Sequence, residues 1–357
     1  MKWFVSYLNA SYKKRVPKGQ WEKKPFNPVL GEQWHMQWAD VHGCGETDVL
    51  CEQVSHHPPI TAFHIKNEKA GVVLKGHSGQ KTRISNATLV CDQPGRELLT
   101  LPSRNNESYL FTSPSLTVRG LWYAAPYVEL IGTTYIQAST GYYATVEYSS
   151  RGWISGEKNH FKCLIRKNSA GPKDYLYKIE GQWSGKSFIT DYKTRVSQPF
   201  IDTADFKPAI AKVKPIEEMG EMETRRIWQK VSEAIRKNDM TTASREKSII
   251  ENKKRAEKKE REEEGVAWKP LYFKWEEDEP TVTKLQQQLA PVLKHTSKYD
   301  MASYSQKGLW VFHEPPKKKE TTTEGSVAAA AAAAATTTTT TTDNTKKKQD
   351  EDDTQSS

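Results

Sequence analysis

The chain has 357 residues, of which 36% are hydrophobic and 27% charged, enough for one large folded domain or two small ones. No run of about 18 apolar residues occurs, so we expect no membrane-spanning helix. The formal net charge is +9, and the stretch from Pro315 onward holds six lysines against seven acids. The preceding part therefore carries about +10, a balance that favours anionic partners such as membrane surfaces, phosphoinositides or nucleic acid.

Cysteine use and the N-terminal sequence indicate a cytosolic protein. The four cysteines show no CxxC spacing, and we expect them to be free thiols of a reducing compartment. The N-terminus has too short an apolar run for a signal peptide and lacks a small-residue cleavage site.

Residues 23–32 predict a rigid loop. Two prolines, Pro25 and Pro28, flank Asn27 and exclude a regular helix or a central strand at this point. Such a loop would hold Lys24 and Asn27 in fixed positions. Taken alone, the stretch is explained equally well by a turn that only connects two elements.

The stretch Glu52-Gln53-Val54-Ser55-His56-His57-Pro58-Pro59 is the most distinctive part of the chain. Proline pushes the preceding residue into extended geometry, and two prolines supply no N–H donors to a sheet. In a regular strand, His56 and His57 would point to opposite faces, so a shared ligand requires a bend, for which the diproline is a plausible cause. For an isolated pair, a strand end with one packed and one solvated histidine is the more common outcome.

From Gln33 to about Phe200 the sequence predicts an antiparallel β-meander, either a barrel or a sandwich. Short apolar segments such as 72–74 and 88–90 are followed by glycine or proline turns, and residues 143–148 alternate between apolar and polar side chains. Helical periodicity is absent, and no repeat of 20–50 residues indicates a propeller or solenoid.

Helical character begins after Pro215. A first helix is predicted over 223–237, where Ile227, Val231 and Ile235 form an apolar stripe, and a second over about 241–264. Residues 245–264 hold eight Lys and Arg against seven Glu, so most of the second helix must be solvated. An aromatic segment (268–273), a short helix (284–293) and an apolar segment (309–312) follow. After these, alanine and threonine runs predict a disordered tail.

Lys247, Glu251 and Arg255 stand at i, i+4 and i+8 of the second helix and therefore share one face. A surface ion-pair ladder worth under about 1 kcal/mol is the default interpretation. The alternative is a phosphate clamp, in which the two cations bind phosphate oxygens and the glutamate holds them in place.

These three elements together resemble the oxysterol-binding-protein-related family of lipid carriers, in the right order and at plausible separation. Gly265, Trp268, Pro270 and Phe273 also match the family's segment after the helix. The resemblance implies an incomplete antiparallel β-barrel around a lipid tunnel, with a C-terminal helical layer. It covers residues 1–313, with the barrel over about 20–215 and the layer over about 216–313; residues 314–357 are the expected tail.

The resemblance further implies exchange of phosphatidylinositol 4-phosphate for a second lipid, a sterol or phosphatidylserine, between membranes. His56 and His57 would contact the 4-phosphate, Lys24, Asn27, Lys247 and Arg255 would surround the headgroup, and Glu251 would orient the cations. Phosphate should favour protonated histidine, so binding should weaken as pH rises well above about 6.5. No bond is made or broken, so the resemblance implies neither an enzyme nor a cofactor.

Family members carry an apolar N-terminal lid upstream of the segment that begins this sequence, and we expect the lid to be missing here. The alternative function is therefore a phosphoinositide sensor or adaptor without efficient transfer. Anionic membranes are the expected partners of a cytosolic monomer that binds peripherally, with endoplasmic reticulum contact sites as its implied address. We find no FFAT-type acidic tract.

Three other functions are weighed. Ser55 beside His56 suggests a hydrolase, but neighbours in an extended chain face apart, and no GxSxG occurs. A metal site could draw on histidines and cysteines, but their spacing matches no zinc template; the candidates are His35, His42, Cys44, Cys51, His56 and His57. A nucleic-acid binder would fit the charge, but no finger or glycine-aromatic motif is present.

Overall fold

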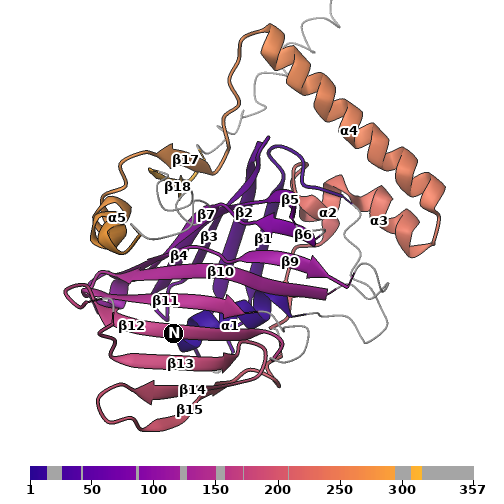
Figure 1. Ribbon diagram of the computed structural model, residues 1–357. Helices are drawn as coiled ribbons and strands as arrows, with labels where there is room; N and C mark the ends of the chain where they lie inside the picture. The colour runs from indigo at the N-terminus through magenta and orange to yellow at the C-terminus, as the bar shows by residue number, and fades with distance from the viewer. Residues whose placement is uncertain are drawn as a thin grey trace, which may run out of the picture. The chain divides into compact units, whose positions relative to one another are not determined.

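Figure 1 shows the computed structural model of the chain. The structure describes residues 1–13, 26–41, 43–85, 88–120, 127–149, 157–171, 173–207, 209–293 and 307–315. All of them except Pro315 belong to one compact unit, Met1–Glu314. Among these residues, no helix has both the length and the apolar character needed to cross a bilayer.

A single antiparallel sheet of sixteen strands forms most of the unit. Its main path runs β15-β14-β13-β12-β11-β10-β8-β7-β4-β3-β2-β1-β16, and β5, β6 and β9 form a branch that pairs with β10. Nearly every strand pairs with its neighbour in sequence, as the predicted meander requires. Within the described residues β15 and β16 do not pair with each other, so the sheet is an incomplete barrel, as predicted.

The strands and two short 3-10 helices, η1 and η3, have the following bounds: β1 (Gln33–Trp38), β2 (Thr47–His56), β3 (Pro59–Asn67), β4 (Val72–Gly79), β5 (Lys81–Ser85), β6 (Thr88–Asp92), β7 (Gly95–Leu101), η1 (Pro102–Arg104), β8 (Glu107–Phe111), β9 (Ser115–Arg119), β10 (Tyr127–Ala138), β11 (Tyr142–Ser149), β12 (His160–Lys167), β13 (Tyr177–Gln182), β14 (Lys186–Asp191), β15 (Ser197–Asp202), β16 (Ala211–Lys212) and η3 (Ile216–Glu218).

Strand β11 shows how the alternating pattern is used. Ala144, Val146 and Tyr148 join the core cluster inside the sheet. Tyr143 points to the other face and packs against Leu289 of the outer helix α5 (Pro280–Leu293). Successive side chains of a strand face opposite ways, so one strand contributes to two apolar layers.

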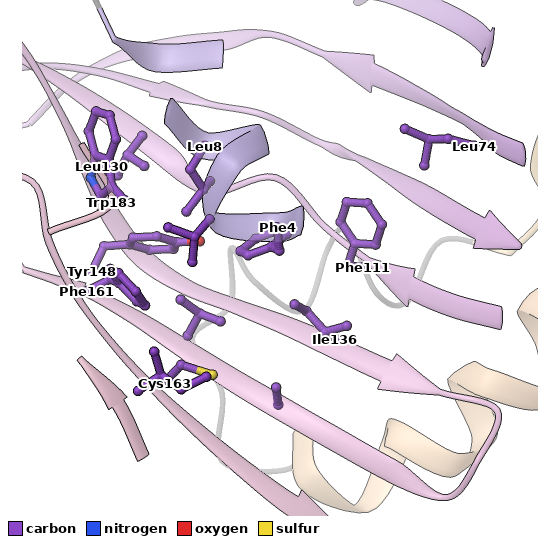
Figure 2. Close-up of a cluster of buried hydrophobic side chains, with 14 residues drawn as sticks. Phe4, Leu8, Leu74, Phe111, Leu130, Ile136, Tyr148, Phe161, Cys163 and Trp183 are labelled. Atoms are coloured by element: carbon purple, nitrogen blue, oxygen red, sulfur yellow. The ribbon is translucent and has the colours of Figure 1, made fainter. Parts of the chain in front are cut away.

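Helix α1 (Lys2–Tyr12) lies on the inner side of the sheet, an element that the sequence analysis did not predict. Its Phe4, Val5 and Leu8 are buried in the same core cluster as Phe111 and Phe161. Figure 2 shows Phe4 and Leu8 directed from the helix toward side chains of the surrounding strands. The positions i, i+1 and i+4 fall on one helical face, which explains why this short segment folds against the sheet.

An apolar cavity of about 530 Å³ lies beside α1. Its wall combines the start of the helix with inward-facing strand residues, among them Trp3, Phe4, Leu99, Phe111, Ile136 and Ile165. The inside of the sheet is thus only partly filled by α1.

The outer face of the sheet carries a C-terminal layer of mixed structure (Figure 1). Strands β17 (Phe273–Glu276) and β18 (Leu309–Phe312) form a small sheet of their own. Helix α5 (Pro280–Leu293) packs Val282 and Leu285 against Leu98 and Leu110 of the large sheet. Apolar contact on both faces of β7 and β8 therefore holds the barrel wall between α1 and this layer.

The remaining helices are α2 (Thr224–Ile227), α3 (Gln229–Arg236) and α4 (Met240–Glu263). The single helix predicted over 223–237 is wrong, because Trp228 interrupts it. Trp228 is buried, stacks on Phe26 with ring centroids 4.2 Å apart, and donates its indole N–H to Glu32. The chain turns at Trp228, which allows the side chain to make these contacts, and the helix is interrupted as a result.

Candidate functional site

The two histidines lie at a tight turn between β2 and β3. His56 ends β2, Pro59 begins β3, and the peptide bond between His57 and Pro58 is cis. His56 Nδ1 and His57 Nε2 are 3.3 Å apart, and both side chains are exposed. The predicted bend is present, and it brings the two imidazoles to one point on the surface.

The residues before the histidines fix the position of this hairpin. Gln53 donates from its amide nitrogen to the Ser55 carbonyl (2.8 Å) and accepts from the Thr61 hydroxyl (2.6 Å), across a bulge in the pairing of β2 with β3. Buried Glu52 accepts the backbone N–H groups of Leu271 (2.7 Å) and Tyr272 (2.8 Å). Burial raises the pKa of Glu52, and these two donors oppose that shift.

The loop that carries Asn27 is hydrogen-bonded to the same strand. The N–H of Gly31 donates to the Gln53 carbonyl (2.9 Å), and the N–H of Gln53 donates to the Glu32 carbonyl (2.8 Å). The Glu32 carboxylate accepts from the Val29 N–H and from the Trp228 indole, both at 2.9 Å. The loop is therefore hydrogen-bonded to β2 on one side and to Trp228 on the other, and it presents the exposed Asn27.

Gly31 also makes room for the segment that follows α4. Its φ of +79° favours glycine, and a Cβ at this position would lie 2.7 Å from Cη2 of Trp268. The guanidinium of Arg261 lies 5.3 Å from the centre of the Trp268 ring. Trp268 thus joins the loop to the C-terminal end of α4.

Helix α4 packs through Ala243 and the partly buried Ile250 against the apolar cluster that contains Trp228, and it is tied to the rest of the unit at both ends. Of its 24 residues, Ala243 is the buried one, and Asp239 caps the N-terminus by accepting the Thr242 N–H at 2.9 Å. The chain before α4 is tied to Glu32 through Trp228, and the chain after it is tied to Glu52 through residues 271–272. Two buried carboxylates from the N-terminal motifs therefore help to fix where this charged helix lies.

Lys247, Glu251 and Arg255 have the geometry that their spacing predicts. The Glu251 carboxylate lies 3.6 Å from the Lys247 ammonium and 3.5 Å from the Arg255 guanidinium. The three side chains share one face of α4, and the glutamate stands between the two cations.

A cleft of about 730 Å³ brings the loop, the hairpin and α4 together. Asn27, His56, His57, Glu251 and Arg255, all named from the sequence, lie in its wall. Lys247 is not among the lining residues; it lies one helical turn before Glu251. Lys24 lies outside the described residues. The full lining consists of Asn27, Val29, Leu30, Val54, Ser55, His56, His57, Glu251, Lys254, Arg255, Glu257, Lys258, Arg261, Glu262, Val266 and Trp268.

Sequence reasoning missed the three further cations of this wall: Lys254, Lys258 and Arg261. They follow Glu251 by three, seven and ten residues, the positions of one helical face. That spacing was the available signal, but in a helix so rich in charge it could not separate a cleft-facing cation from a solvated one.

The surroundings of His56 in the cleft shift the pKa of its imidazole. Partial desolvation of the otherwise exposed ring, the neighbouring His57 and the Lys258 charge all lower the pKa of His56, whereas the Glu251 charge raises it. The hairpin and α4 are therefore close enough to interact electrostatically. A neutral imidazole offers one donor and one acceptor, and an imidazolium offers two donors.

The metal site considered from the sequence finds no support in the described residues. No group of three or more His, Cys, Asp or Glu side chains could hold a metal ion in this part of the chain. Burial raises the pKa of Cys51 to about 12, which disfavours the thiolate that a metal requires. His42, another candidate ligand, lies outside the described residues.

Comparison with known proteins identifies relatives of this chain. A family model described as oxysterol-binding protein matches residues 1–234. The chain is 42% identical to Protein kes1 of Schizosaccharomyces pombe over 279 residues, which cover 77% of this chain and 71% of that protein. The chain belongs to the oxysterol-binding protein family. Its membership identifies a domain of the lipid-binding and lipid-transfer type.

More distant relatives and solved structures extend the comparison. The human oxysterol-binding protein-related protein 8 is 35% identical over 277 residues, 76% of this chain and 30% of its own length. The crystal structure of the Osh1 ORD domain with ergosterol has a TM-score of 0.61 at 18% identity, covering 87% of this chain and 71% of that one. The Osh3 ORD of Saccharomyces cerevisiae with PI(4)P has a TM-score of 0.53 at 19% identity, covering 71% and 67%. These two structures share the fold.

Proposed function

We propose that the chain binds the headgroup of phosphatidylinositol 4-phosphate in the cleft and exchanges this lipid for a second one between membranes. One observation carries the proposal: the paired imidazoles, Asn27 and the cationic face of α4 line the same cleft. The Osh3 ORD, which shares the fold, was solved with PI(4)P, and this supports the choice of headgroup.

The chemistry of the cleft suits a phosphate monoester. Such a group carries close to two negative charges and several acceptor oxygens, so it needs several fixed donors. His56 and His57 supply ring N–H groups, Asn27 an amide, and Arg255 a planar fork of donors. Arg255 donates to the Asn252 side-chain oxygen at 2.7 Å and lies 3.5 Å from Glu251, so two partners orient the guanidinium before the lipid arrives.

For the second lipid we propose a sterol or phosphatidylserine. The Osh1 ORD was solved with ergosterol and with cholesterol, and the apolar cavity beside α1 is the space that a lipid body could use in this chain. Exchange makes and breaks no covalent bond, so the proposal assigns no enzymatic activity. We place the protein in the cytosol as a monomer that visits anionic membranes, with Lys24 and Lys247 as further headgroup contacts and residues 314–357 as a solvated tail.

A liposome extraction assay tests the proposal. Purified protein is mixed with vesicles that contain phosphatidylinositol 4-phosphate, the vesicles are removed by centrifugation, and the lipid left in solution is measured. Replacing both His56 and His57 by Ala should abolish extraction and leave the urea unfolding midpoint unchanged. His160→Ala is the matched control, because His160 lies on β12 away from the cleft and bonds Ser149 at 3.0 Å.

The outcomes separate exchange from its alternative. Extraction that is lost only in the double variant, and that is inhibited by preloading with a sterol or phosphatidylserine, supports exchange. Binding to these vesicles without extraction would identify a phosphoinositide sensor or adaptor instead. Extraction by the double variant equal to that of the control would refute the headgroup assignment.

A further inference from the structure

We propose that Lys258 is a headgroup-contacting cation that stands across the cleft from His56 and favours doubly charged phosphate monoesters over singly charged lipid headgroups. The inference rests on the proposed function of the cleft. It concerns a residue outside the Lys247, Glu251 and Arg255 set that the sequence motif marks.

The first step is the position of Lys258 on α4. It follows Glu251 by seven residues and Arg255 by three, so all three side chains lie on the helical face that lines the cleft. Lys258 and His56 line the same cleft, and the Lys258 charge is near enough to lower the pKa of His56. Lys247 lies on the same face but beyond the lining of the cleft.

The second step is that the Lys258 ammonium is weakly held. It pairs with Glu262 at 3.5 Å, and the two side chains are 56% and 67% exposed. An exposed ion pair of this kind contributes little to stability, so a phosphate can replace the carboxylate at little cost. By contrast, Lys254 is 23% exposed and pairs with Glu257 at 2.8 Å.

Charge balance explains the expected selectivity. The described cleft wall holds four cations (Lys254, Arg255, Lys258 and Arg261) and three carboxylates (Glu251, Glu257 and Glu262), a small positive excess when the histidines are neutral. Removing Lys258 abolishes that excess. A doubly charged monoester then loses more attraction than a singly charged headgroup does, because Coulomb energy scales with the product of the charges.

The test compares two neighbouring lysines. Lys258→Gln removes the charge in the cleft, whereas Lys259→Gln removes an equal charge from a side chain that is 78% exposed, pairs with Glu263 at 3.7 Å and is absent from the lining. Lys258→Arg keeps the charge. We expect Lys258→Gln to lower extraction of phosphatidylinositol 4-phosphate at least about tenfold, a loss of about 1.4 kcal/mol. Lys259→Gln and Lys258→Arg should resemble the wild type.

Two further measurements complete the experiment. Binding to vesicles with phosphatidylserine as the only anionic lipid should change less than threefold in Lys258→Gln. NMR titration of His56 in the lipid-free protein should show a higher pKa in Lys258→Gln and no change in Lys259→Gln, which checks the proximity of the two groups without any lipid.

The possible failures are distinct. If the wild type extracts phosphatidylinositol 4-phosphate and Lys258→Gln extracts it as well as Lys259→Gln does, the role of Lys258 is refuted and the proposed function stands. An equal loss for both headgroup types would refute the selectivity. If the wild type extracts no phosphatidylinositol 4-phosphate, both proposals fail.

Discussion

Replacing Glu52 by Ala should destabilise the protein and loosen the cleft at the same time. The buried Glu52 carboxylate accepts two backbone N–H groups, from Leu271 at 2.7 Å and Tyr272 at 2.8 Å. A hydrogen bond to a charged group contributes about 1.5–3 kcal/mol, and an unsatisfied buried donor costs a similar amount. Because burial raises the pKa of Glu52, desolvation offsets part of this gain. We therefore expect a loss near the lower limit for two bonds, about 3 kcal/mol.

The assay has a global and a local part. Urea unfolding should show the free energy of unfolding reduced by about 3 kcal/mol in Glu52→Ala and by roughly half as much in Glu52→Gln, which retains one acceptor oxygen. Hydrogen exchange should speed up most at the amides of residues 271–276. Glu276→Ala is the matched control, because Glu276 lies exposed on β17.

The same substitution should impair lipid binding without touching the imidazoles. Residues 271–272 fix the chain that follows α4, and Trp268 in that segment lines the cleft. We expect extraction of phosphatidylinositol 4-phosphate to fall severalfold in Glu52→Ala under conditions where the variant is fully folded. An unfolding free energy within 0.5 kcal/mol of the Glu276→Ala control, roughly the scatter of neutral surface substitutions, would refute this account of how the C-terminal layer is attached.

Two further predictions concern pH. Buried Glu97 accepts the hydroxyls of Tyr7 (3.0 Å) and Ser113 (2.7 Å), and burial raises its pKa from 4.5 to about 7. The folded state thus holds this proton more tightly than the unfolded state does: the associated stability is complete below pH 4.5 and is lost as pH rises through 7, by about 3 kcal/mol. Glu97→Gln should remove this fall in urea titrations at pH 5 and pH 8, and an unchanged fall would contradict the assignment. Lipid extraction should decrease from pH 6 to pH 8 because bound phosphate favours protonated His56, and the same slope in the His56/His57 double Ala variant would show that other groups cause it.

The sequence predicted those features that depend on local chemistry. The prolines after His57 predicted a bend, which is present. Of the loop predicted over 23–32, the structure describes residues 26–32, which form neither a helix nor a strand, as predicted. The i, i+4, i+8 spacing predicted that Glu251 would stand between Lys247 and Arg255, which the ion pairs confirm. Turn signals and alternating side chains predicted an antiparallel meander, because both depend on backbone preferences of a few adjacent residues.

Features that depend on contacts between distant segments were not predicted. Trp228 interrupts a helix because Phe26 and Glu32, almost two hundred residues earlier, bind its ring and its indole N–H. Helix α1 exists because its apolar face meets strands that lie far along the chain. Likewise, the cleft includes Lys258 and leaves out Lys247 because of where α4 lies, and the helical pattern treats the two lysines alike.

Within each motif, the exposed residues and the buried residues have different roles. Asn27, His56 and His57 are exposed and can reach a ligand, whereas Glu32 and Glu52 are buried and bind other parts of the chain. Glu32 binds the indole just before α3 and Glu52 binds the backbone just after Trp268, so the two carboxylates hold the chain on either side of α4.

A helix with one buried residue cannot position itself by packing alone. The motifs therefore have two roles. Their exposed residues present donors to a phosphate, and their buried carboxylates help to hold α4 opposite the histidines. It follows that substitution of a buried motif carboxylate and substitution of an exposed histidine should both reduce lipid binding, but only the carboxylate substitution should also reduce the stability of the fold.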